Sequence, residues 1–222
     1  MRGRFITFEG GEGTGKTTQA STLAMRLKSF GLGVVVTREP GGSPGAEAIR
    51  HVLLSGAAKP LGPYAEAILF AAARDDHVRQ TIRPALDHGK WVVCDRFIDS
   101  TRIYQGALSN VDPRLISRLE RITVGDTTPD LTFILDVPAA LGLERAGKRR
   151  GNRAADRFET ETQEFHEKLR QAYLELAERE PDRCIVIDGS AEASVVAEAI
   201  WAVVNRRLNP AEAPAAIEGA AS

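Results

Sequence analysis

The segment GGEGTGKTT, residues 10 to 18, combines glycines, a lysine and threonines in an order suited to binding phosphate. Gly10, Gly15, Lys16 and Thr17 fit the spacing G-x-x-x-x-G-K-S/T. Glycines let backbone N–H groups turn toward an anion, the lysine reaches the β- and γ-phosphates of a nucleotide, and the threonine hydroxyl ligates Mg²⁺. The sequence therefore predicts a nucleotide-binding loop made of Gly10, Gly11, Glu12, Gly13, Thr14, Gly15, Lys16, Thr17 and Thr18.

A magnesium ion at this loop needs an acid on a neighbouring strand. The apolar segment WVVCD, residues 91 to 95, ends in Asp95, although an aspartate there is equally consistent with a strand end that only meets solvent. Two polar pairs follow, and an incipient helix would present both at the carboxyl edge of the sheet, where ligands bind. These pairs, each four residues apart, are Ser100 with Tyr104 and Thr101 with Gln105. We therefore predict Thr17 and Asp95 as metal ligands.

The elements that must position these residues follow from the apolar pattern. Five short runs alternate with longer helical patterns, and they span residues 4–8, 33–37, 91–95, 131–137 and 184–188. Their near-continuous hydrophobicity suits strands covered on both faces by the intervening helices. The clearest helical stripe is Ala20, Leu23, Ala24, Leu27 and Phe30, which Gly31 ends. The predicted fold class is α/β, a doubly wound five-stranded parallel sheet flanked by helices.

Length and composition favour one domain that binds small ligands. The chain has 222 residues, and its 29 Lys and Arg nearly balance its 30 Asp and Glu, so neither nucleic acid nor a membrane is expected as the main partner. No apolar signal segment and no run of ~18 apolar residues is present, which predicts a cytoplasmic protein. Cys94 and Cys184 are expected as small buried side chains. We expect residues 1–208 to form the domain and the proline-containing residues 209–222 to be disordered.

Taken together, the motifs give the chain a family resemblance: it resembles the bacterial thymidylate kinases, P-loop enzymes that transfer the γ-phosphoryl of ATP to dTMP. The resemblance extends from Phe5 to about Asp188. It rests on FEGGEGTGKTTQ (8–19), TREPGG (37–42), FAAARDDH (70–77), DRFIDSTRIYQG (95–106) and PDLTFILDVP (129–138). The phosphate loop is shared by many families, whereas its combination with TREPGG and DR…S…YQG is specific. Arg102 and Ile103 depart from the usual pattern before Tyr104.

The resemblance implies an acceptor site for dTMP. Phe70 and Arg74, four residues apart on a predicted helix, would stack on the base and donate to its edge, although core packing is the alternative for Phe70. Arg96 and Arg38 would bind the acceptor phosphate, and Tyr104 would lie where a 2'-hydroxyl would clash. The full implied set is Glu12, Arg38, Glu39, Pro40, Phe70, Arg74, Arg96, Ser100, Thr101, Tyr104 and Gln105.

Phosphoryl transfer also needs positive charge at the γ-phosphoryl, and the loop contributes only Lys16. The segment RAGKRRGNRAADR, residues 145 to 157, holds six basic residues and two glycines. A solvated helix face would explain this run equally well. Because the phosphate loop lacks an arginine, we predict a mobile lid over residues 142–158 that places catalytic charge on the phosphoryl and excludes water. The predicted catalytic residues are Lys16, Arg149, Arg150 and Arg153.

Glu12 is the unexpected residue of the loop, because a carboxylate there would repel a triphosphate. The resemblance includes an acid near this position that hydrogen-bonds the 3'-hydroxyl of the acceptor sugar, whereas a solvated loop residue is the alternative. It further implies Mg²⁺ as cofactor, ATP and dTMP as partners, and a homodimer. Two other functions stay open, another pyrimidine or deoxynucleoside monophosphate kinase and a P-loop GTPase switch. The absence of an N-K-x-D stretch counts against the switch.

Overall fold

The computed structural model describes residues 2–151 and 158–212. Five parallel strands form one sheet in the order β2-β3-β1-β4-β5. Their bounds are β1 Phe5–Glu9, β2 Val34–Arg38, β3 Trp91–Asp95, β4 Leu131–Asp136 and β5 Cys184–Asp188. Each strand lies within one residue of its predicted position, and the predicted fold class is confirmed.

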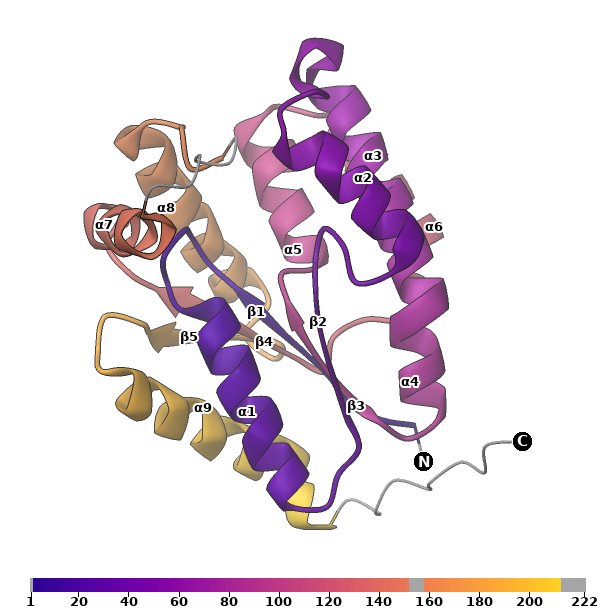
Figure 1. Cartoon of the computed structure of the whole chain (residues 1–222), viewed down its shortest axis with the longest axis vertical. Coiled ribbons are helices and arrows are strands. Elements are labelled where there is room, and N and C mark those ends of the chain that lie inside the picture. The colour runs from indigo at the N-terminus through magenta and orange to yellow at the C-terminus, as the bar shows by residue number, and fades with distance from the viewer. Residues whose placement is uncertain (1, 152–157, 213–222) are drawn as a thin grey trace.

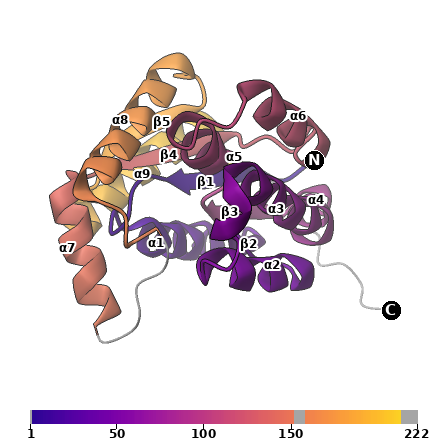
Figure 2. The same ribbon diagram turned by 90° about the horizontal axis from the view of Figure 1, so that it is seen from above.

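Helices cover both faces of this sheet (Figure 1). The α-helices are α1 Lys16–Ser29, α2 Pro44–Leu54, α3 Gly62–His77, α4 Arg83–Asp87, α5 Ile98–Thr101, α6 Pro113–Thr123, α7 Ala139–Arg150, α8 Gln163–Arg179 and α9 Ala193–Leu208. Shorter elements are the 3-10 helices η1 Lys59–Leu61 and η4 Pro210–Glu212 and the π-helices η2 Val78–Ile82 and η3 Arg102–Leu108. Seen from above, α7 and α8 lie on one side of the molecule and α2 and α3 on the other (Figure 2).

The hydrophobic core consists of two layers because successive strand residues point to opposite faces. Ile6 and Phe8 of β1 pack in one cluster with Leu27 of α1 and Ile200 of α9. Phe5 points to the opposite face, where it packs with residues of η2, α4 and α5. The prediction of strands buried on both faces holds for the central strands but not at the sheet edges. Edge residues such as Val36 of β2 and Val186 of β5 are exposed.

The helix that follows the phosphate loop buries the predicted stripe up to Leu27, whereas Phe30 is half exposed and packs on Trp201 with ring centroids 5.1 Å apart. Both cysteines are buried, as expected.

At the carboxyl end, Pro210–Glu212 form a short 3-10 helix with Pro210 buried, so the first residues of the predicted tail are folded. Residues 213–222 lie outside the described part of the chain. Within the described ranges, no helix is long and apolar enough to cross a membrane.

Candidate active site

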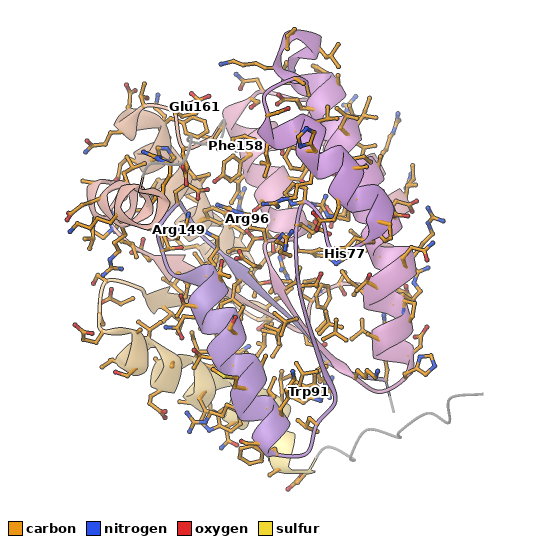
Figure 3. The ribbon with its side chains drawn as sticks, in the orientation of Figure 1. His77, Trp91, Arg96, Arg149, Phe158 and Glu161 are labelled. Atoms are coloured by element: carbon orange, nitrogen blue, oxygen red, sulfur yellow. The ribbon has the colours of Figure 1, made fainter. Side chains whose placement is uncertain are left out.

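A cavity of about 530 Å³ opens at the carboxyl ends of β1, β2 and β3. This position is expected for a ligand site in an open α/β sheet, and the volume suits a small molecule. Arg96, Arg149 and Phe158 lie at this end of the molecule, whereas Trp91, at the start of β3, lies at the other (Figure 3). All eleven predicted acceptor residues line the cavity, together with Gly13, Gly15, Lys16, Thr17, Thr18, Asp95 and Arg149.

The phosphate-binding loop joins β1 to α1 as predicted, and α1 begins at Lys16 with its amino end toward the cavity. Gly13 and Gly15 have φ angles of 69° and 94°, a left-handed conformation that glycine adopts without strain. Lys16 Nζ donates to the carbonyl oxygens of Gly10 at 3.2 Å and Gly11 at 2.6 Å. Burial lowers the pKa of Lys16 to about 8. Gly10, Gly11 and Thr14 do not line the cavity, and the Thr14 hydroxyl donates to the Gly11 carbonyl oxygen at 3.1 Å within the loop.

The two predicted metal ligands meet beside this loop. Thr17 Oγ1 donates to Asp95 Oδ2 at 2.5 Å. The contact forms because Asp95 ends β3, which pairs directly with β1, and Thr17 lies in the first turn of α1, which follows the loop after β1. A hydroxyl and a carboxylate are hard oxygen ligands of the kind that Mg²⁺ prefers. The donor set present therefore fits this ion.

Glu12 contacts Arg96 across the cavity floor. Arg96 Nη2 donates to Glu12 Oε1 at 2.5 Å, and the Glu12 side chain is only 13% exposed, which rules out a solvated loop residue. Burial alone would raise the pKa of Glu12, but the charges of Arg96, Lys16 and Arg149 hold this pKa at about 2. Glu12 is therefore a carboxylate that balances a cluster of cations.

The wall opposite the phosphate loop is built around a buried ion pair. Arg74 Nε donates to Glu39 Oε2 at 2.8 Å, and His77 Nδ1 lies 3.0 Å from Glu39 Oε1. Asp76 of the same helix accepts from the Ser43 hydroxyl and the Ala46 N–H. Residues 74–77 of α3 thus contact both Glu39, which follows β2, and the residues at the start of α2. Arg74 and Glu39 also line the cavity. Their ion pair therefore orients both side chains before a ligand binds.

The helix that carries the two polar pairs differs from the expected one. It is α-helical only over α5, and it continues as the π-helix η3. A π-helix has a wider turn than an α-helix and is frequent at functional sites. Both predicted pairs still line the cavity, and the buried Thr101 Oγ1 has no hydrogen-bond partner among the described residues.

Comparisons with known proteins identify the family. A sequence model described as thymidylate kinase matches residues 8–200. This chain belongs to the thymidylate kinase family. It is similar to the thymidylate kinase of Nitrobacter hamburgensis, with 59% identity over 94% of this chain and 90% of the relative. It is also similar to that of Afipia carboxidovorans, with 61% identity over 93% of this chain and 91% of the relative.

A crystal structure of the Ehrlichia chaffeensis thymidylate kinase is similar to this chain, with a TM-score of 0.72 and 35% sequence identity. The likeness covers 92% of this chain and 99% of that one. The thymidylate kinases are ATP-dependent nucleoside monophosphate kinases, and so is this member of the family. The predicted GTPase alternative is thereby excluded.

The structure distinguishes the arginines of the predicted lid from one another. Arg149 lines the cavity and donates to Glu159 Oε1 at 3.3 Å. Arg150 donates to Glu159 Oε2 at 2.8 Å and does not line the cavity. Arg153 falls within residues 152–157, which lie outside the described part of the chain. Among the described arginines of this segment, Arg149 is therefore the one placed at the site.

The helix α7 that carries Arg149 packs directly on the phosphate loop of the kinase. A Cβ atom on Gly13 would lie 1.9 Å from the Gly142 carbonyl oxygen, and one on Gly142 would lie 2.4 Å from the Glu12 carbonyl oxygen. The two backbones thus touch where only glycine fits. Arg145 of the same helix donates to the carbonyl oxygens of Gly189 at 2.8 Å and Ser190 at 2.9 Å. These contacts fix α7 against the loops that follow β1 and β5, at the carboxyl ends of the strands.

Four cavity residues were not predicted: Arg50, Leu54, Phe97 and Phe158. Phe158 lies beside Phe70 and Tyr104, with ring centroids 6.3 Å and 5.2 Å away, so the segment predicted to be a lid contributes an aromatic side chain to the cavity. Arg50 Nη1 donates to the Pro40 carbonyl oxygen at 2.6 Å. The available signal was one arginine in a helix that also carries Glu47 and His51, and this signal is weak without the fold.

Proposed function

We propose that this kinase transfers the γ-phosphoryl of Mg-ATP to dTMP, giving dTDP and ADP. One observation carries the proposal: a single cavity joins the phosphate-binding loop to all eleven predicted acceptor residues. The relatives of this chain are named thymidylate kinases, which supports dTMP as the acceptor.

On the donor side, the loop N–H groups and the amino end of α1 would hold the ATP phosphates. Lys16 would stabilise charge on the transferring phosphoryl, and Thr17 with Asp95 would hold Mg²⁺. When bound, Mg²⁺ supplies positive charge that neutralises the phosphate oxygens.

On the acceptor side, Phe70 would stack on the base, and Arg74 would donate to its edge from a guanidinium that Glu39 already orients. Arg96, with Arg38, would bind the acceptor phosphate. Glu12 would accept from the sugar 3'-hydroxyl beside its contact with Arg96. Tyr104 would exclude a 2'-hydroxyl.

The direct test measures ADP formation from Mg-ATP with dTMP, dUMP, UMP and dCMP as acceptors. We expect the highest kcat/KM for dTMP and a low value for UMP. Equal or higher kcat/KM for another monophosphate would favour the second function left open by the sequence, a different pyrimidine or deoxynucleoside monophosphate kinase.

The position of Arg149 makes the lid prediction specific. Arg149→Ala should lower kcat more than it raises KM for dTMP, because a charge on the transferring phosphoryl acts mainly in the transition state. Arg150→Ala should have a smaller effect, because this side chain does not line the cavity. Steady-state kinetics of both variants and of Arg153→Ala check the order, with the exposed Lys148→Ala as control. Wild-type kcat in all three arginine variants would show that the basic run is only a solvated helix face.

We further propose a cytoplasmic homodimer. The two helices α3 and α6 pack together and expose apolar side chains, among them Tyr64, Ile68 and Ile122, whose exposed fractions are 50%, 52% and 72%. A second copy of the chain would cover such a face. Sedimentation equilibrium measures the mass, and a monomer of 24.0 kDa at micromolar concentration would contradict the dimer.

A further inference from the structure

Glu9, the last residue of β1, is fully buried and does not line the cavity. Its carboxylate accepts four hydrogen bonds. The backbone N–H groups of Phe97 and Ser100 donate to Oε1 at 2.8 Å and 3.3 Å. The Ser100 and Tyr173 hydroxyls donate to Oε2 at 2.7 Å and 2.9 Å. A buried carboxylate is costly unless it is hydrogen-bonded in this way, and all of these donors lie around one cavity residue.

That residue is Arg96, which has a φ angle of 69°. Left-handed backbone is uncommon for a residue with a Cβ atom and is maintained only where the surroundings hold it. The N–H of Arg96 donates to the Phe8 carbonyl oxygen at 2.9 Å, and the next N–H, that of Phe97, is the one bound by Glu9. Both ends of the left-handed turn are thus held by the end of β1.

The same hydroxyls that donate to Glu9 also contact the Arg96 side chain. Arg96 Nη1 lies 3.3 Å from Ser100 Oγ and 3.4 Å from the Tyr173 hydroxyl oxygen, and it donates to the Gly10 carbonyl oxygen at 3.1 Å. Because both hydroxyls give their protons to Glu9, their lone pairs remain for the guanidinium. Glu9 therefore controls both the backbone and the side chain of Arg96.

We propose that Glu9 is a positioning residue for the acceptor phosphate, acting through Arg96, Ser100 and Tyr173. This rests on the proposed function, in which Arg96 binds the phosphate of dTMP. An apolar residue at the end of β1 would fill the same space, but it could not hold the turn at residues 96–100. Glu9 thus fixes the position of the guanidinium that binds the acceptor phosphate, although its own carboxylate does not line the cavity.

The test compares the Kd of dTMP with the Kd of thymidine, which lacks the phosphate, by isothermal calorimetry on the full chain. Glu9→Gln keeps the size of the side chain, but one end of the amide is an NH2 group that cannot accept a hydrogen bond. Either the two N–H groups or the two hydroxyls therefore lose their acceptor. We expect the dTMP Kd to rise about tenfold or more, as for loss of charge-assisted hydrogen bonds, and the thymidine Kd to change less than about twofold. Equal weakening of both ligands, or no weakening of dTMP binding, would overturn the proposal.

Two further variants separate positioning from general loss of stability. Thr7 lies in the same strand as Glu9, and Thr7→Val removes a buried 2.7 Å hydrogen bond between the hydroxyls of Thr7 and Thr132 of β4. This variant should leave both Kd values unchanged. Tyr173→Phe removes one donor to Glu9 and should weaken dTMP binding about two- to tenfold without affecting thymidine. It decides the matter should Glu9→Gln fail to fold, and an unchanged dTMP Kd in Tyr173→Phe would then count against the proposal.

The Arg96→Met variant distinguishes this proposal from the function on which it rests. It should weaken dTMP but not thymidine, and adding Glu9→Gln to it should cause little further loss, because the two residues act through one contact. If Arg96→Met weakens both ligands equally, the assignment of the acceptor phosphate to Arg96 fails. If Arg96→Met discriminates and Glu9→Gln does not, only the role of Glu9 fails.

Discussion

Lys16→Ala is expected to lower kcat at least about a hundredfold, the largest effect of any single substitution considered for this protein. Removing a preorganised charge at a transferring phosphoryl costs ~3 kcal/mol or more. The charge is preorganised because Lys16 is buried at the start of α1 and held by the loop carbonyl oxygens of Gly10 and Gly11. Steady-state turnover of dTMP with saturating Mg-ATP measures the loss.

A matched control for this substitution lies in the same helix. Lys28 is exposed near the end of α1, and Lys28→Ala should retain wild-type kcat. The thermal unfolding midpoint of both variants shows whether α1 remains intact. A folded Lys16→Ala protein that keeps more than about a tenth of wild-type kcat would remove the basis for assigning phosphoryl transfer to this loop.

Glu12→Gln is expected to lower kcat/KM for dTMP by about tenfold to a hundredfold, as for a lost charge-assisted hydrogen bond of ~1.5 to 3 kcal/mol. ATP affinity should be unchanged or improved, because a negative charge near the phosphates is removed. The structure adds a second contribution, since Glu12 accepts from Arg96 Nη2 at 2.5 Å. The substitution therefore weakens both the contact with the sugar hydroxyl and the hold on Arg96.

An acceptor without the hydroxyl separates the two contributions. We expect Glu12→Gln to cost clearly less kcat/KM with 3'-deoxy-dTMP than with dTMP, and the loss that remains measures the Arg96 contact. Four kcat/KM values decide the question, two enzymes with two acceptors, and Glu144→Gln on the exposed side of α7 serves as control. Equal losses with both acceptors would show that Glu12 acts through Arg96 or the loop and not on the sugar.

Features encoded in short segments were predictable from the sequence. Each strand is a continuous apolar run, and the phosphate loop is a fixed spacing between a strand and a helix, so both were placed to within a residue. Parallel strands bring their carboxyl ends to one edge, which explains why Thr17 and Asp95, 78 residues apart, could be paired correctly. The acceptor residues came from the family resemblance, and the structure brings all eleven to one cavity.

Features that depend on contacts between distant segments were not predictable in this way. Glu9 and Tyr173 are 164 residues apart, and no local pattern links a strand-end glutamate to a tyrosine in α8. The change from α-helix in α5 to π-helix in η3 depends on tertiary packing, because the sequence spacing fits a continuous α-helix. Arg50 lines the cavity because α2 packs beside α3, and helix propensity carries no information on that arrangement.

The backbone contact between Gly13 and Gly142 turns α7 into a lever with its pivot at the phosphate loop. Arg149 lies seven residues beyond the pivot, which is about 10 Å along a helix that rises ~1.5 Å per residue. A tilt of about 10° at Gly142 would then move the Arg149 backbone by roughly 2 Å, more than the ~0.5 Å within which a catalytic group must be held. A Cβ atom at either glycine would push the two backbones apart and tilt α7. The position of Arg149 therefore depends on the absence of a side chain at Gly13 and Gly142.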